Sequence, residues 1–357
     1  MDTQIEVVFN RLLTSALEQK ASDLFLFPGQ KPFIRTEGII KDLLNEQVLT
    51  ANFIEVILGR ILSPEQQEIF KRQQQLIFSR ELGKNHRARV NVFRQNNLAA
   101  ISIKLIPNKI ISLEQLKLPK IVTDLAALKK GMIIVSGPKD SGRSNLVAAM
   151  IDYINKNSSR YISTLERPIE NVFVGHKSLV EQREIGRDVL SFADGLNSVK
   201  NKSVDVLMVS EVESPTIFLE LLQIVQRGIL VIALMEVDTV YNVIRQTIES
   251  FEPEKQGLAK FLFGETLGGI ICTRLVSRIG GGRVLALEVF NGSPVAKNLI
   301  KEGRVFQLKN IFQVTEKELS ISLDRFLADL VKSGQITLEE ALKHAIEPES
   351  LKSLTNY

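Results

Sequence analysis

The sequence predicts an α/β fold: a P-loop domain preceded by a smaller α+β domain. Residues 137–144, Gly-Pro-Lys-Asp-Ser-Gly-Arg-Ser, have the spacing of a GxxxxGK[ST] phosphate-binding loop, with arginine in place of the lysine. The apolar run 131–136 before them predicts a buried strand, and 146–151 after them predict a helix, which is the context such a loop requires. Upstream, apolar residues alternate as they do in half-buried strands.

The N-terminal part predicts an α+β domain over residues 1–105. Residues 5–20 have helical spacing, 23–27 alternate as a strand, and a turn follows at Pro28-Gly29. Thr50 and Ser63 are expected to start helices. The runs 76–81, 87–93 and 99–105 are expected to be strands of one antiparallel sheet.

Residues 106–119 predict a linker, because they are apolar, rich in lysine and bounded by prolines. From 120 to 357 we expect a doubly wound α/β domain with a helical tail from about residue 293. Its predicted strands are apolar on both faces, as a buried parallel sheet demands, and they are 132–136, 160–165, 204–210 and 229–235.

Composition excludes several classes of protein. The 357 residues are 44% hydrophobic and have no apolar run typical of a membrane span, so we expect a cytoplasmic protein without direct membrane insertion. The net charge of +4 is mixed along the chain and there is no tryptophan, so no nucleic-acid partner is indicated. The single cysteine, Cys272, lies in an apolar run and is expected to be a buried thiol.

The loop chemistry suggests ATP and Mg²⁺ as ligands. In a P-loop, backbone N–H groups and the helix N-terminus hold the phosphates, while a lysine reaches them and a hydroxyl binds Mg²⁺. Ser144 retains the hydroxyl. Arg143 retains a charge, but its planar fork does not fit the notch of an ammonium group, and Asp140 adds a carboxylate. The candidate nucleotide-binding residues are Gly137, Lys139, Ser141, Gly142, Arg143 and Ser144. Alternatively, the segment is a Gly-rich turn that binds no ligand.

Two carboxylates are candidates for catalysis. Ligands of parallel sheets bind at the carboxyl ends of the strands. Glu166 follows the predicted strand 161–165, and Glu211 follows 206–210. Each could be a solvated carboxylate at a strand end, but their expected position on neighbouring strands beside the loop favours a catalytic role.

The chain resembles the type IV pilus twitching-motility (PilT-like) ATPases of the secretion ATPase superfamily over nearly its whole length. The matching blocks are 21–24, 83–97, 106–107, 137–144, 164–170, 182–184, 205–211, 280–283 and 298–302. The resemblance implies a PAS-like N-terminal domain, a RecA-like C-terminal domain, a ring hexamer with nucleotide between subunits, and a role in pilus retraction.

The departures from this family cluster on its chemical motifs. Arg143 replaces the phosphate-reaching lysine, Arg167 the acidic-box aspartate, Ser210 the Walker B glycine, Glu213 an arginine, Ile229 and Glu236 the two histidines of the histidine box, and Asn197 and Asn201 two further arginines. Losing one comparable electrostatic contact raises the barrier by roughly 3 to 4 kcal/mol. The departures therefore predict impaired hydrolysis, although Lys139, Arg143 and Arg167 can still attract phosphates.

Two further segments match functional positions of the family. Arg87, Arg89 and Arg94 match residues near the subunit interface and the nucleotide; alternatively, they form the outward face of a strand. Residues 294–304 match a helix associated with retraction, which implies an interaction role for Lys297, Asn298, Leu299, Ile300, Lys301 and Glu302. Alternatively, this is an ordinary amphipathic helix.

Three functions stay open at this point. The preferred hypothesis is a degenerate PilT-like paralogue that joins or docks on an active motor as a homo- or hetero-hexamer. It would work in the cytoplasm, free or at the inner face of the cell membrane beside the pilus platform. The alternatives are an active retraction ATPase with a site rebuilt around Arg143, and a structural adaptor that binds no nucleotide.

Overall fold

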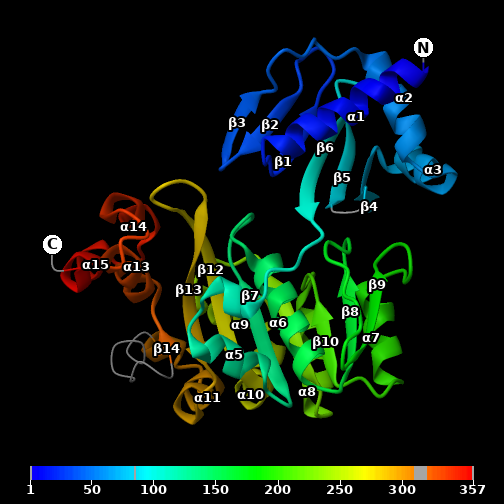
Figure 1. Cartoon of the computed structure of the whole chain (residues 1–357). Coiled ribbons are helices and arrows are strands. Elements are labelled where there is room, and N and C mark those ends of the chain that lie inside the picture. Colours follow the sequence, from blue (N-terminus) through cyan, green and yellow to red (C-terminus); the bar gives the residue numbers. More distant parts are fainter. Residues whose placement is uncertain (1, 84–85, 309–319, 356–357) are drawn as a thin grey trace. The chain divides into compact units, whose positions relative to one another are not determined.

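The computed structural model describes residues 2–83, 86–308 and 320–355, and it divides into two compact units (Figure 1). Unit 1 comprises residues 1–109 and 168–172, and unit 2 comprises residues 110–167 and 173–357. The predicted domain limits, residues 1–105, 106–119 and 120–357, stay a prediction. No helix in the described part of the chain is long and apolar enough to cross a bilayer.

Unit 1 is built on a six-stranded antiparallel sheet with the order β3-β2-β1-β6-β5-β4. Its elements in chain order are α1 (Asp2–Glu18), β1 (Asp23–Leu26), β2 (Phe33–Thr36), β3 (Ile39–Asp42), α2 (Ala51–Ile61), α3 (Pro64–Gln73), β4 (Gln75–Leu82), β5 (His86–Gln95) and β6 (Leu98–Pro107). The three strands predicted to share one antiparallel sheet are β4, β5 and β6, so this prediction is confirmed.

Both predicted helix starts in unit 1 are confirmed by their caps. The Thr50 hydroxyl accepts the Phe53 N–H and starts α2. Ser63 starts α3 through a capping box with Gln66, in which each side chain satisfies a backbone N–H of the other residue. The prediction misses β2 and β3, because each has only four residues and all side chains of β3 are exposed, which leaves no apolar alternation.

Unit 2 is built on an eight-stranded sheet with the order β14-β13-β12-β7-β11-β10-β8-β9. Its first elements are α4 (Leu113–Leu116), α5 (Lys120–Ala126), β7 (Gly131–Ser136), α6 (Arg143–Asn157), β8 (Tyr161–Glu166), β9 (Leu179–Glu184), α7 (Phe192–Lys200), β10 (Val206–Val209), α8 (Pro215–Gln226) and β11 (Leu230–Met235). The remaining elements are α9 (Val240–Glu249), α10 (Pro253–Thr266), β12 (Leu267–Ser277), β13 (Arg283–Asn291), α11 (Pro294–Lys301), η1 (Val305–Gln307), β14 (Ser320–Ile321), α13 (Leu323–Lys332), α14 (Leu338–His344) and α15 (Pro348–Thr355).

The centre of this sheet is parallel and covered on both faces. Strand β7 is buried at every residue. Met132 and Ile134 belong to one apolar core, with side chains from α7 to α10, whereas Ile133 and Val135 belong to another, with α6. The four predicted parallel strands correspond to β7, β8, β10 and β11, which confirms the predicted α/β class.

The remaining strands of unit 2 lie outside the predicted set. Strand β9 is at the edge of the sheet, and its residues Glu181 to Glu184 are mostly charged, so it lacks the apolar run typical of a buried parallel strand. The antiparallel strands β13 and β14 extend the other edge beyond β12. Helices α13 and α14 pack against β13 and β12 (Figure 1). Residues 309–319 of the predicted helical tail lie outside the described residues.

A carboxyl group is buried where β13 contacts the start of α9. Glu288 is 6% exposed, and its Oε2 accepts the Val240 N–H at 2.8 Å. Burial raises the pKa of Glu288 to about 7, while the Val240 N–H and Arg274 oppose the increase. The folded protein therefore holds this proton more tightly than the unfolded chain.

The variant Glu288→Gln should lose a pH-dependent part of the stability. Between pH 4.5 and about 7 the folded state keeps a proton that the unfolded state releases, so this contribution to stability falls as pH rises. Glutamine retains an acceptor for Val240 but does not titrate. The free energy of unfolding of the wild type minus that of the variant should therefore decrease by about 3 kcal/mol across this range. Urea unfolding at both pH values measures the difference, and a constant value would contradict the assignment.

Candidate functional site

The P-loop is held in shape by the scaffold around it. Gly137 has φ +147°, and a Cβ there would lie 2.5 Å from the Ser141 Oγ and 2.7 Å from the Thr273 carbonyl oxygen, so only glycine fits. Ser141 is buried, and its hydroxyl lies 2.8 Å from that of Thr273 on β12. The loop conformation therefore depends on packing between β7 and β12.

The start of α6 provides backbone donors for an anion. Gly142, with φ +93°, is the N-cap residue and supplies no side-chain cap. The first-turn N–H groups of a helix have no intrahelical acceptor, and together with the helix dipole they favour a bound phosphate. Ser144, the second residue of α6, is half-buried. Lys139 and Asp140 on the loop are exposed, with Asp140 in the left-handed region at φ +60°. The start of α6 thus presents backbone N–H groups next to a glycine-containing loop.

Arg143 is bound by acceptors of the protein itself. Its Nη1 donates to the Met235 carbonyl oxygen, and its Nη2 donates to Glu236 Oε1 at 2.7 Å. The Arg143 side chain is 14% exposed, and that of Glu236 is 57% exposed. The cation at the P-loop lysine position is therefore paired with a carboxylate at the end of β11.

A second arginine near this loop, Arg167, is also paired with a glutamate. Arg167, directly after β8, forms an ion pair with Glu213. Its backbone N–H donates to the Ser210 hydroxyl at 2.9 Å, and its guanidinium lies 5.0 Å from the centre of the Phe192 ring. Arg167 thus contacts both Ser210 and Glu213, which lie in the segment after β10.

The two predicted catalytic carboxylates follow neighbouring strands, but their environments differ. Strands β8 and β10 are adjacent and parallel, with Leu165 opposite Val209. Glu166 at the end of β8 is 5% exposed and accepts hydrogen bonds from Thr164 Oγ1 at 2.8 Å and Gln182 Nε2 at 3.0 Å. Glu211, the second residue after β10, is exposed. The geometry gives Glu166 a fixed position and leaves Glu211 accessible.

The three N-terminal arginines contact groups within unit 1. Arg87 is buried and donates to the Ser79 hydroxyl at 3.0 Å. Arg89 pairs with Glu170 at 3.3 Å, and Arg94 pairs with Glu55 at 3.4 Å. These pairs account for the arginines on β5 as structural contacts, and their expected place near a nucleotide stays a prediction.

The predicted interaction residues lie on or directly after α11, and they do not form one continuous exposed face. Ile300 is fully buried in the core of unit 2, and Leu299 packs against that core. Lys297 and Lys301 reach Glu265 on α10. The exposed members of the set are Asn298 and Glu302.

Sequence patterns did not reveal some of the residues that shape this site. Thr273 anchors the loop from β12, and the Met235 carbonyl oxygen binds Arg143. A backbone acceptor carries no sequence signal, and Thr273 lies 132 residues from Ser141. Among the described residues, no group of three or more His, Cys, Asp and Glu side chains is arranged to hold a metal ion. Cys272 is buried, as expected.

Comparisons with known proteins agree with this architecture. The retraction ATPase PilT of the type IV pilus from Pseudomonas aeruginosa PAO1 is 32% identical over 339 residues, which cover 95% of this chain and 98% of that protein. The type IV pilus ATPase PilU of the same organism is 30% identical and covers 96% of this chain and 90% of its own length. The crystal structure of the pilus retraction motor PilT with bound ADP superposes with a TM-score of 0.84 at 33% identity, covering 96% of this chain and 98% of that one.

The family assignment rests on a match that covers most of the chain. Residues 1–316 match the type II/IV secretion system protein family. Together with the near-complete coverage of PilT, this confirms the resemblance predicted from the motifs. The chain belongs to the type II/IV secretion system protein family and, within it, to the PilT-like twitching-motility ATPases.

Proposed function

We propose that this chain is an accessory subunit of a type IV pilus retraction system, with weak or absent ATP hydrolysis, that acts together with an active motor subunit. The observation that carries the proposal is the pairing of Arg143 with Glu236 and the Met235 carbonyl oxygen. The cation at the P-loop lysine position is thereby engaged inside the protein.

This pairing matters because phosphoryl transfer depends on positive charge placed around the phosphate oxygens. Arg143 is neutralised by Glu236, and Arg167 is neutralised by Glu213. Each ion pair cancels a charge that would otherwise stabilise developing negative charge. Removing one such contact slows a reaction by roughly 100-fold to 1000-fold, and losses within one site are not additive.

The residues of the loop fit a nucleotide only in part. The backbone around Gly137 and Gly142 fits a phosphate, and Ser144 would be the residue to hold Mg²⁺, which would neutralise phosphate charge when bound. Arg143 does not fit the role of the lysine while it pairs with Glu236. We therefore propose that ATP and Mg²⁺ bind weakly.

The proposed partners follow from the relatives. Because PilT is described as a pilus retraction motor, we propose that this chain acts together with PilT-like subunits. The ring hexamer that the family resemblance implies would then be a homo- or hetero-hexamer. It would work in the cytoplasm, at the inner side of the pilus membrane platform. Asn298 and Glu302, exposed on or after α11, would contribute to contacts with other components.

An active motor with a rebuilt site is the second candidate. Two observations favour it: Ser144 is retained on α6, and Glu211 is accessible at the end of β10. In this case Arg143 would release Glu236 when nucleotide binds. Tight Mg-dependent ATP binding and loss of turnover in Arg143→Ala would support this candidate against the accessory role.

Purified protein should hydrolyse Mg-ATP no faster than its Glu211→Gln variant. The reason is that both arginines of the site are neutralised, so the barrier is not lowered enough for turnover. In a mixture with a PilT-like motor from the same cell, the wild-type chain should change the rate of the motor. Steady-state phosphate release, measured alone and in the mixture, tests both expectations.

The opposite outcome would be clear in the same assay. Turnover by the chain alone at a rate comparable with active motors, abolished by Glu211→Gln, would establish an independent motor and overturn the accessory role. No turnover together with an unchanged motor rate would also contradict it.

The variant Glu236→Gln should bind Mg-ATP about fivefold more tightly than the wild type. Removing the carboxylate releases Arg143 for phosphate and takes one negative charge from the site, an effect of about 1 kcal/mol for a partly exposed pair. Isothermal titration calorimetry of both proteins measures the change in Kd.

The matched control is Glu249→Gln on α9. Glu249 pairs with Arg245 at 2.8 Å and is 56% exposed, compared with 57% for Glu236, so the two variants remove the same charge from similar surroundings. An equal change in both variants would mean that net charge alone acts. No change in Glu236→Gln would mean that the pair does not restrain the arginine.

A further inference from the structure

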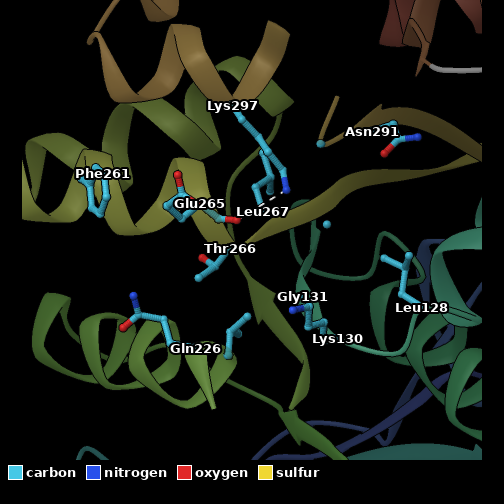
Figure 2. Close-up of a pocket in the computed structure, with 13 residues that line it drawn as sticks. Leu128, Lys130, Gly131, Gln226, Phe261, Glu265, Thr266, Leu267, Asn291 and Lys297 are labelled. Atoms are coloured by element: carbon cyan, nitrogen blue, oxygen red, sulfur yellow. Dashed lines mark hydrogen bonds between the residues drawn. The ribbon is translucent and has the colours of Figure 1, made fainter. Parts of the chain in front are cut away.

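A cavity of about 540 Å³ lies at the amino-terminal ends of β7 and β12, at the opposite end of these strands from the P-loop. Gly131 at the start of β7 and Leu267 at the start of β12 line it, whereas the P-loop follows the other end of β7, after Ser136. Figure 2 shows the lining residues, which also come from α8, α10, β13 and α11. The cavity is thus separate from the nucleotide site.

Backbone rather than side chains forms part of the cavity wall. The pairing of β12 with β7 shifts register between Leu267 and Gly269, which places a bulge at Gly268 in the wall. A Cβ at Gly292 would lie 2.3 Å from the Leu267 carbonyl oxygen, so no side chain fits there. Bulges often occur beside functional sites because they redirect the chain. The hollow is therefore built into the strand ends.

The charged groups around the cavity favour an anion. Lys130, directly before β7, and Lys297 on α11 line it, and Glu265 is the only carboxylate among the described lining residues. The Glu265 carboxylate pairs with Lys301. This contact lowers the pKa of Glu265 and offsets the negative charge of the carboxylate. Lys297 extends from α11 toward Glu265 and Leu267, and its Nζ donates to the Glu265 carbonyl oxygen at 3.4 Å (Figure 2). An ammonium group has three donors, so this long contact leaves others for a ligand.

Apolar side chains beside these lysines narrow the class of ligand. Phe261 on α10 lines the cavity and is 52% exposed. Leu128, Val225 and Leu267 also line the cavity. Aromatic side chains such as Phe261 are enriched at surfaces that bind other proteins. A small polar anion would make no use of them.

We propose that this cavity binds an acidic segment of a partner protein, with a carboxylate at Lys130 and Lys297 and a neighbouring apolar residue against Phe261. The proposal rests on the proposed role of α11 as an interaction segment, and it assigns the contact to the cavity beside Lys297 rather than to the whole run 297–302. The charge complementarity and the adjacent apolar side chains carry it.

Selection from a phage-displayed library of random peptides tests the proposal. The full-length wild-type chain should enrich peptides that combine Asp or Glu with Phe or Leu. A synthetic peptide of the enriched sequence should bind about tenfold more weakly to Lys297→Glu and to Lys130→Glu, and binding should weaken with salt. Lys130→Glu changes a different element from Lys297→Glu, so a folding defect in one variant does not decide the result.

The control variant is Lys332→Glu on α13, which makes the same charge change at an exposed lysine outside the cavity and should bind the peptide like the wild type. Peptides without acidic residues, equal binding to all variants, or no enrichment would overturn the proposal. If free citrate displaced the peptide at a comparable concentration, the cavity would be a small-molecule site instead. The selection contains no ATP and no motor, so its failure is distinguishable from failure of the accessory role.

Discussion

Burial of β7 on both faces is the constraint on which the site depends. Its side chains alternate between the two apolar cores of unit 2, so the strand cannot shift without exposing one of them. At its end, the Ser136 hydroxyl bonds to the carbonyl oxygens of Met235 and Val237 at 3.2 and 2.6 Å. Ser141 then ties the loop to β12. Hydrogen bonds from β11 and β12 therefore help to hold the P-loop in its conformation.

Ion pairs within unit 2 engage the two arginines beside the loop. The Arg143 side chain is 14% exposed, and a mostly buried cation is costly without a partner, which Glu236 supplies. Arg167 is more exposed, and it pairs with Glu213. In the proposed accessory role, both pairs would offset positive charge that a bound phosphate would otherwise contact.

The sequence patterns predicted the features that depend on residues close together in the chain. Strand β7, the loop and α6 follow from apolar runs and glycine spacing, and the Thr50 and Ser63 caps follow from side chains that bond within a few residues. Adjacency of β8 and β10 was predicted from the fold class. The pairing of Arg143 with Glu236 spans 93 residues, so the replacements were visible but their contact was not. The edge strand β9 was missed because its polar residues lack the required period.

The two ends of the parallel strands differ in the charged side chains that surround them. At the carboxyl ends of the strands, Arg143 and Arg167 are each paired with a glutamate. At the amino-terminal ends, Lys130 and Lys297 line a cavity. Ile300 is buried in the core and fixes α11 to the same sheet that carries the P-loop. The cavity and the P-loop therefore belong to one folded unit. Under the proposed accessory role, changes at the phosphate-binding ends of the strands would leave the cavity beside Lys130 and Lys297 unchanged, because the two sites lie at opposite ends of β7.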